Sequence, residues 1–439
     1  MIFLFEQYGY KRSGFYLQHI EENEAIKIIQ KLSSLKECGF RKTVSRYKQD
    51  ALCLNIDYDE KEQHFHFETS YFVGVDWIIP NQQAVYVQPK MNKEEIQVDY
   101  LSMLFEAMQE PENFNHLEGL LDIDFDKPYI EIEQKIDILS PFLLIQFIQV
   151  LKNIVRKGLK KSYFQVTENF EAKVKGKILV HKTLKTNVLK NKLTKTVCQY
   201  EKFGINNEEN KILKRAFHFA KYAILSYKGI KEEEIQHIIN YINPAFENIT
   251  DDVNLNKLKI FKPNPMYKEY EHGLKLALLI LKRYSYNIQN TALIDKVKTP
   301  PYWIDMSKLF ELYVFKKLRD IFPKQGELTY HLKTNRQELD FLLNHTDVDG
   351  NKLQLVIDAK YKPRYENENI STDDARQISG YARLKSIYEN LKVDKNKLID
   401  CLVIYSDTSD IYELKKEKLI SIEDKNYQNF YKIGIGLPK

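Results

Sequence analysis

Two short apolar runs near the end of the chain carry charged residues at positions where core residues are expected. The runs are residues 338–343 and 355–362, and the residues between them are rich in turn formers. This pattern predicts a β-hairpin. Side chains two positions apart on a strand share a face, so Asp358 and Lys360 point the same way. Pairing of the two strands then brings Asp340 beside them.

Two acids and one lysine in this setting favour phosphodiester hydrolysis with a bound metal ion. Carboxylate oxygens are the ligands that Mg²⁺ or Mn²⁺ prefers. We expect Asp340, Asp358 and the carbonyl of Ala359 to hold the cation, which polarises a phosphate oxygen and acidifies a water molecule. Lys360 would orient that water and offset charge in the transition state. Glu311 is a candidate further ligand, direct or through water. The alternative is a buried ion pair, which carries several kcal/mol of desolvation for each ion.

The surrounding pattern predicts a C-terminal α/β domain with a mixed sheet. Its expected order is helix 305–322, strands 327–334, 337–343 and 353–360, a helix that begins at Ser371 or Thr372, and strands 398–405 and 431–435. On the second helix, Gln377 and Tyr381 lie four positions apart. They share a helical face and can reach the same site.

The stretch 151–195 carries a high concentration of positive charge. It holds 13 lysine or arginine residues against Glu168 and Glu171, a net charge of +11, whereas the whole protein has +5. Such a stretch is typical of a surface that binds the DNA backbone. Few aromatic residues accompany the lysines, which favours phosphate contact over base stacking. The candidate DNA-binding residues are Lys173, Lys175, Lys177, Lys182, Lys185, Lys190, Lys192 and Lys195. A solvated basic face or a site for an acidic protein partner is the alternative.

The whole chain is predicted to be a multidomain α+β protein. Residues 1–138 form a mixed, β-rich N-terminal domain, with a hairpin over 64–88 and helices at 22–36 and 99–108. Residues 139–298 form a helical, basic middle domain. Tandem prolines at 300 and 301 predict the start of the C-terminal domain, 299–439, because they interrupt helices and central strands alike.

Apolar spacing in the middle domain predicts a helix after Ser140 and further helices at 210–225, 232–242 and 267–284. Breaks are expected at Pro244 and at residues 263–265.

Composition excludes some classes of protein. No run approaches the roughly 18 apolar residues of a membrane span, and the first residues lack the pattern of a signal peptide. We therefore expect a cytoplasmic protein with no membrane partner. The four cysteines are far apart and lack zinc spacing. His64 and His66 could share a strand face as metal ligands, but without a third ligand nearby an exposed strand face is the simpler interpretation.

The charged residues of the C-terminal domain resemble the PD-(D/E)xK nuclease signature. The matching residues are Glu311, Asp340 and Asp358-Ala359-Lys360, with Leu339 where the signature has proline and Asp358 in place of the commoner glutamate. Asp374, Gln377 and Tyr381 resemble the acidic and QxxxY elements on the following helix of many such nucleases. The resemblance implies a metal-dependent nuclease domain with Asp340, Asp358, Lys360, Glu311, Gln377 and Tyr381 as its catalytic residues.

Upstream motifs resemble the McrC family. They are residues 72–75 and 87–91, Gly176-Lys177-Ile178, residues 198–203, Asn206-Asn207 and residues 210–214, in the family's order. The resemblance implies the endonuclease subunit of a modification-dependent restriction system. Its partners would be a McrB-like AAA+ GTPase hexamer and modified double-stranded DNA. The chain has no GxxxxGK[ST] phosphate loop of its own. The resemblance implies that its N-terminal domain docks on the partner's ring and stimulates GTP hydrolysis, and that the partner in turn activates cleavage.

Two other functions stay open on the sequence. A repair exonuclease or nickase of the same superfamily would cut DNA without GTP. A non-catalytic subunit would hold DNA with the middle domain and activate an AAA+ partner. Cleavage by variants at Asp358 or Lys360 separates these hypotheses.

Overall fold

The computed structural model describes most of the chain. The described residues are 1–6, 31–37, 39–46, 49–61, 64–89, 99–133, 139–225, 232–250, 252–253, 267–289, 296–334, 337–362, 365, 369–394, 396–407 and 412–438. They form helices and five β-sheets, so the expected α+β class is confirmed. They divide into two compact units, Met1–Phe142 with Ile294–Lys439 and Leu143–Leu293.

The first unit contains an N-terminal sheet that a distant segment completes. Its strands are, in spatial order, β1 (Ile2–Phe5), β6 (Gln83–Gln88), β5 (Phe72–Ile79), β13 (Tyr302–Asp305) and β7 (Leu121–Ile123). The predicted hairpin between β5 and β6 is confirmed. The strand β13 pairs with both β5 and β7, so residues more than 170 positions apart share one sheet.

A second N-terminal sheet packs on the first. It consists of β2 (Phe40–Arg46), β3 (Gln49–Asp59) and β4 (His64–Thr69). Both sheets contribute to one apolar cluster that includes Ile2, Cys53, Ile56, Phe65, Phe72, Val85 and Trp303. On β4, His66 faces Asp59, with 3.6 Å between His66 Nε2 and Asp59 Oδ2.

The tandem prolines do not separate two independent domains. They lie between β12 (Lys296–Thr299), which pairs with β8 (Ile130–Glu133), and β13. Both flanking strands belong to N-terminal sheets, and Trp303 is buried in the N-terminal core. The boundary predicted at residue 299 therefore cuts through that core. Proline is accommodated here because it falls between strands, where no ladder hydrogen bond is needed.

The C-terminal part of the first unit has the predicted order of elements, except that two helices stand where one was expected after the third strand. These are α8 (Met306–Ile321), β14 (Leu328–Thr334), β15 (Gln337–Thr346), β16 (Lys352–Lys360), α9 (Thr372–Tyr381), α10 (Lys385–Leu391), β17 (Asp400–Asp407) and β18 (Phe430–Gly436). The sheet order is β14-β15-β16-β17-β18. The first three strands are antiparallel, and β16, β17 and β18 are parallel, so the sheet is mixed, as expected.

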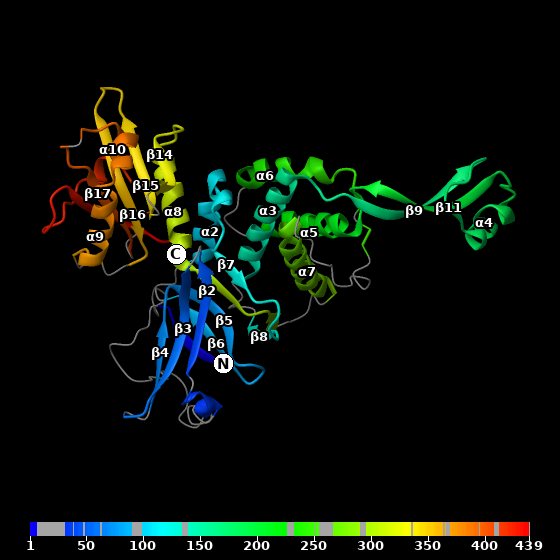
Figure 1. Cartoon of the computed structure of the whole chain (residues 1–439), viewed down its shortest axis with the longest axis horizontal. Helices are drawn as coiled ribbons and strands as arrows, with labels where there is room; N and C mark the ends of the chain where they lie inside the picture. The colour runs from blue at the N-terminus through cyan, green and yellow to red at the C-terminus, as the bar shows by residue number, and fades with distance from the viewer. Residues whose placement is uncertain are drawn as a thin grey trace. The chain divides into compact units, whose positions relative to one another are not determined.

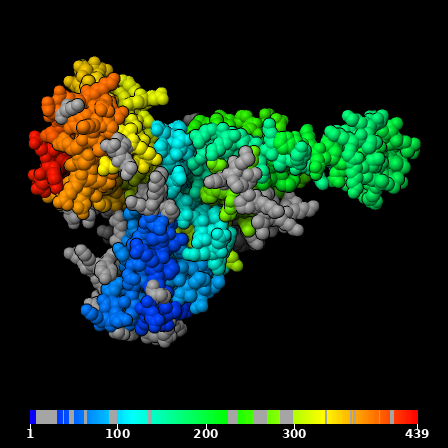
Figure 2. All heavy atoms as spheres, in the orientation of Figure 1, coloured from blue at the N-terminus to red at the C-terminus, as the bar shows by residue number. Residues whose placement is uncertain are grey.

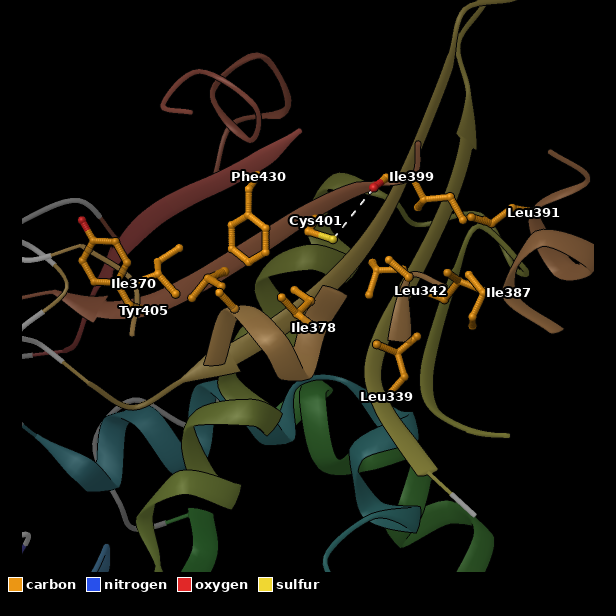
Figure 3. Packing of buried hydrophobic residues seen from close by; sticks show 14 of the residues in the cluster. Leu339, Leu342, Ile370, Ile378, Ile387, Leu391, Ile399, Cys401, Tyr405 and Phe430 are labelled. Atoms are coloured by element: carbon orange, nitrogen blue, oxygen red, sulfur yellow. Dashed lines mark hydrogen bonds between the residues drawn. The ribbon is translucent and has the colours of Figure 1, made fainter. Parts of the chain in front are cut away.

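The helices α9 and α10 cover one face of this sheet (Figure 1). Figure 3 shows Ile378 of α9 and Ile387 of α10 among the strand residues Leu342, Cys401 and Phe430. This apolar layer continues along the sheet toward the ends of β15 and β16. It holds α9 over the strand that carries Asp358.

The second unit is helical with a protruding sheet. Its helices are most of α3 (Leu139–Lys157), then α5 (Glu208–Leu225), α6 (Glu232–Phe246) and α7 (Lys268–Gln289). The break predicted at Pro244 is wrong, because α6 continues through it to Phe246. Pro244 lies two residues before the helix end, so the hydrogen bond that proline cannot donate is lost only in the last turn.

The lysine-rich stretch is not simply helical. After α3, the strands β9 (Ser162–Glu171) and β11 (Lys195–Gly204) pair over ten positions. Between them lie β10 (Lys177–Ile178), which pairs with β11, and the short helix α4 (Val180–Thr186). We call residues 171–197 the tip, and the rest of β9 and β11, residues 162–170 and 198–204, the arm. Figure 1 shows the arm leading from the helices of its unit to α4, and Figure 2 shows the tip as a rounded lobe. The prediction of a helical middle domain is thus wrong for this stretch.

Some expectations lie outside the described residues. They are most of the helix at 22–36, the break at 263–265, the side chain of His64, and Lys90 with Met91 of one upstream motif. No described helix has the length and apolar character needed to cross a membrane.

Candidate active site

The two aspartates meet because of the register of β15 and β16. Pairing runs from Thr346 with Lys352 to Phe341 with Ile357. One further step in this register places Asp340 opposite Asp358. Side chains in such positions have Cβ atoms about 5 Å apart. The regular ladder ends there, and the amide of Ala359 donates instead to Asp340 Oδ2 at 2.9 Å.

Both carboxyl groups lie in surroundings that disfavour their charge. Burial raises the pKa of Asp340 well above its usual range, and the charges of Asp358 and Glu311 raise it further. Burial also raises the pKa of Asp358, which is 1% exposed, although Lys360 opposes the shift. Among the described residues, Asp358 Oδ2 has no hydrogen bond of good geometry, although Lys360 Nζ lies 2.8 Å away. The pair thus concentrates negative charge that one ammonium only partly offsets.

Lys360 connects the strand to the helix α9. Its Nζ lies 2.8 Å from Asp358 Oδ2, donates to Gln377 Oε1 at 3.0 Å, and lies 3.8 Å from Asp374 Oδ1. Gln377 Nε2 in turn donates to the hydroxyl of Tyr381 at 3.1 Å. Burial alone would lower the pKa of Lys360, but the nearby carboxylates outweigh burial and raise it. The lysine is therefore held as an ammonium.

Asp374 is a further acid that the structure places in this network. It lies in the first turn of α9, where the Ser371 side chain accepts from its amide at 3.3 Å. Lys362 Nζ lies 2.6 Å from Asp374 Oδ2, and the Tyr365 hydroxyl also donates to it. Burial would raise the pKa of Asp374, but these hydrogen bonds and the lysine charges lower it. Asp374 is thus a stable carboxylate that fixes the segment after Lys360.

A cavity of about 360 Å³ is lined by Asp340, Asp358 and Lys360 together with Glu311. Its walls include Tyr71, Ser307, Glu311, Asp340, Asp358, Ala359, Lys360, Tyr361, Lys362 and Gln377. In the described part of the chain, no three His, Cys, Asp or Glu side chains are arranged to hold a metal ion. Glu311 lines the same cavity as the aspartate pair. The expectation that Glu311 is a further ligand, direct or through water, stays a prediction.

A family model described as McrBC 5-methylcytosine restriction system component matches residues 69–394 of this sequence. The chain belongs to this family. No curated protein matches it. Two solved structures are similar at 15% identity. One is a refined half-complex from a tetradecameric assembly of Thermococcus gammatolerans McrB AAA+ hexamers with bound McrC, with a TM-score of 0.41 and coverage of 100% of this chain and 94% of that chain.

The other is a cryo-EM structure of the Thermococcus gammatolerans McrBC complex. Its TM-score is 0.26, and the match covers 74% of this chain and 88% of that chain.

Two glycines of the McrC-like motifs are explained by close backbone contacts. A Cβ on Gly74 in β5 would lie 2.0 Å from the carbonyl oxygen of Tyr302 in β13. A Cβ on Gly176, which has φ +72°, would lie 2.5 Å from the carbonyl oxygen of Gln199. Glycine is therefore required where β5 meets β13 and where the tip folds back on β11.

The asparagines of the McrC-like motif hold the base of the arm. Asn210 is fully buried and donates to the carbonyls of Lys160 and Ile205, while Asn207 also donates to Lys160. The Tyr270 hydroxyl donates to Asn210 Oδ1 at 2.8 Å and accepts from the Lys160 amide at 2.6 Å. These bonds join both ends of the arm to α5 and α7. The motif residues in this McrBC family chain thus have a structural role.

The candidate DNA-binding lysines all lie on the tip. Seven are exposed, and Lys195 is partly exposed and lies 3.6 Å from Glu171. Lys175 Nζ lies 4.0 Å from the ring centre of Tyr200. Exposed aliphatic side chains lie between the lysines, namely Val174, Ile178, Val180, Leu184, Val188, Leu189 and Leu193. Sequence analysis identified the lysines but not the exposure of these apolar residues.

Proposed function

We propose that this chain is the Mg²⁺-dependent DNA endonuclease subunit of a McrBC-like restriction complex. The C-terminal part would then be a PD-(D/E)xK nuclease domain. The observation that carries the proposal is the register that places Asp340 opposite Asp358, with Lys360 two positions on and hydrogen-bonded to α9. Membership of the McrBC family supports it.

The donor set at the cavity suits a hard divalent cation. Asp340, Asp358 and the carbonyl of Ala359 would hold Mg²⁺ or Mn²⁺, with water and phosphate oxygens as the remaining ligands. The buried Asp358 oxygen and the raised pKa of both carboxyls support this assignment, because a nearby cation would offset the cost of ionising them. When bound, such a cation polarises a phosphate oxygen and acidifies a water molecule.

The protein's own groups would orient the reactants. Lys360, kept protonated by the surrounding carboxylates, donates hydrogen bonds to the attacking water and to the charged phosphate oxygens of the transition state. Gln377 holds this ammonium in place, and Tyr381 holds Gln377. Because a protonated lysine cannot accept a proton, it serves as an electrostatic group and not as the general base.

Nucleotide hydrolysis and the recognition of modified DNA would belong to another chain. The sequence has no GxxxxGK[ST] phosphate loop. In one of the similar assemblies, McrC is bound to McrB AAA+ hexamers. We propose a McrB-like AAA+ GTPase hexamer as the partner, the N-terminal domain as its docking site, and modified double-stranded DNA as the substrate.

The tip would contact the DNA backbone through its exposed lysines. A second candidate for the tip is a protein partner. It is favoured by the exposed Leu189 and Leu193, which are 80% and 75% exposed, because phosphate contact makes no use of aliphatic side chains.

The nuclease proposal is tested with Asp358→Ala and Lys360→Ala. Each variant is combined with the AAA+ partner, GTP, Mg²⁺ and methylated plasmid, and cleavage and GTP hydrolysis are measured separately. We expect cleavage to fall at least about 1,000-fold while stimulation of GTP hydrolysis stays near the wild-type rate.

Three results decide against parts of the proposal. Cleavage that survives either substitution shows that the site is misassigned. Cleavage by the wild type without partner or GTP favours the repair exonuclease or nickase. No cleavage by the wild type, with GTP hydrolysis still stimulated, favours the non-catalytic DNA-holding subunit. Lys316→Ala is the control, since Lys316 lies on α8 and pairs with Asp320 away from the cavity.

A further inference from the structure

A buried lysine lies next to Glu311 in the first turn of α8. Lys308 is 1% exposed. Its Nζ lies 2.8 Å from His331 Nε2, 2.9 Å from the Tyr330 hydroxyl and 3.4 Å from Glu311 Oε2. A buried ammonium is costly unless its hydrogens all find acceptors. Lys308 has three hydrogens and three acceptors, so its burial is compensated.

The direction of these hydrogen bonds follows from the ammonium. An ammonium has no lone pair and can only donate. His331 Nε2 must therefore accept, and the histidine carries its hydrogen on Nδ1, where Glu338 accepts it. The Tyr330 oxygen accepts from Lys308 and directs its own hydrogen to Glu311 Oε2 at 3.5 Å. The lysine and the tyrosine thus both donate toward Glu311.

The backbone at His331 is shaped to allow this arrangement. His331 has φ +54°, a left-handed conformation that is uncommon for residues other than glycine. The β14–β15 ladder pairs Tyr330 with Phe341 and Leu332 with Leu339, and it omits the pair that His331 would form with Asp340. An interrupted ladder directly opposite Asp340 indicates that the imidazole has a specific place beside Glu311. Backbone strain of this kind is held by the surrounding structure and is frequent at functional sites.

We infer that Lys308 is a positioning residue of the nuclease site, which holds Glu311 as an oriented carboxylate on the wall of the cavity. This inference rests on the function proposed above. Glu311 lines the same cavity as Asp340 and Asp358 and contributes to the negative potential there. Lys308 and Tyr330 direct one carboxylate oxygen of Glu311, which sets the direction in which the group can accept a hydrogen bond from water. Neither residue belongs to the nuclease signature.

The inference is tested with Lys308→Met, Lys308→Arg, Glu311→Gln and the Met/Gln double variant. Full-length protein with its AAA+ partner, GTP and methylated plasmid is titrated with Mg²⁺, and Mn²⁺ binding without DNA is measured by calorimetry. We expect Lys308→Met and Glu311→Gln each to lower the maximal cleavage rate about tenfold and to weaken Mn²⁺ binding, with Lys308→Arg nearer to wild type. If Lys308 acts through Glu311, the double variant is no slower than the slower single variant.

Two outcomes overturn the inference. One is a Lys308→Met variant that cleaves within about twofold of wild type with unchanged Mn²⁺ binding. The other is a double variant whose loss is the product of the two single losses. Lys316→Met on the same helix is the matched control and is expected to cleave like wild type.

A further variant covers the case in which Lys308→Met does not fold. Tyr330→Phe keeps the ring stacked on Phe315, at 4.7 Å between ring centres, and removes only the hydroxyl. We expect it to lower the maximal rate about threefold or more, with the same Mg²⁺ dependence as Glu311→Gln. A wild-type rate in this variant decides against the inference. Failure of the proposed function is distinct, since the wild type would then not cleave or Asp358→Ala would cleave normally.

Discussion

At the scale of single residues, the candidate site contains acids of two opposite kinds. Asp340 and Asp358 have raised pKa values because burial disfavours their charge, and the charges of Asp358 and Glu311 raise the pKa of Asp340 further. Asp374 has a lowered pKa, because hydrogen bonds from Lys362 and Tyr365 outweigh its burial. Asp340 and Asp358 therefore reduce the stability of the folded protein when they are ionised, whereas ionised Asp374 increases it. Acids that reduce stability are retained where function needs them.

This difference predicts stability changes of opposite sign for two aspartate-to-asparagine substitutions. At neutral pH, above the pKa of an unfolded aspartate, Asp340→Asn removes a destabilising charge while its side-chain oxygen can still accept from the Ala359 amide. We expect it to stabilise the metal-free protein by about 1 kcal/mol. Asp374→Asn loses charge-assisted hydrogen bonds and is expected to destabilise by about 1 kcal/mol. Urea unfolding with a chelator measures both, and changes of the same sign would refute the assignment.

The residues of the candidate site divide into those that a sequence pattern can identify and those that it cannot. Asp340, Asp358 and Lys360 were predicted to converge because the period of a strand is two, and the observed register brings them together. Lys308 and His331 were not identified. Their contacts depend on the left-handed backbone at His331, which has no glycine to signal it. The partners of Asp374 were missed because Lys362 and Tyr365 lie in an irregular segment.

At the scale of secondary structure, helices and strands with one apolar face toward the core could be predicted from the sequence. The arm could not. The C-terminal order from α8 to β18 follows from apolar periodicity, apart from the separate helix α10, which was not predicted. Along the tip, lysines lie among apolar residues that remain exposed, so the apolar periodicity of the sequence no longer indicates which side chains are buried. Pairing of β9 with β11 instead depends on the buried asparagines at its base and on Gly176 at the tip. Such long-range contacts leave no local pattern.

The tip allows its two proposed roles to be separated with neighbouring residues. Lys190→Gln with Lys192→Gln removes two exposed charges, whereas Leu189→Ser with Leu193→Ser removes two exposed aliphatic side chains. If the lysines contact phosphates, the first pair lowers the salt dependence of DNA binding by about two ions. The leucine pair should leave DNA binding unchanged, and it should weaken stimulation of the partner's GTPase if the tip binds protein. An unchanged salt slope in the lysine pair would refute DNA contact at these positions.

At the scale of the whole first unit, the C-terminal sheet and the N-terminal sheets are parts of one structure. Tyr361, next to Lys360, donates its hydroxyl hydrogen to Glu6 Oε1 of the N-terminal segment at 3.0 Å. The strand β13 supplies Trp303 to the N-terminal core and leads directly into α8, whose Asp305 N-cap accepts from the Lys308 amide. A boundary at paired prolines is a reasonable sequence inference, but proline marks the ends of strands as well as linkers. Only the pairing of β13 with β5 and β7 shows that these prolines mark the end of a strand and not a linker between domains.

This continuity predicts that the two parts of the first unit unfold together. The chain has two tryptophans, so Trp77→Phe leaves Trp303 as the single fluorescent probe of the N-terminal core. Amide hydrogen exchange in β15 and β16 reports the C-terminal sheet of the same variant. Because β13, α8 and the Tyr361 contact connect the two regions, we expect their urea midpoints to agree within about 0.3 M. A Trp303 transition well below the loss of protection in β15 and β16 would show that the C-terminal sheet folds independently, as the boundary at residue 299 implies.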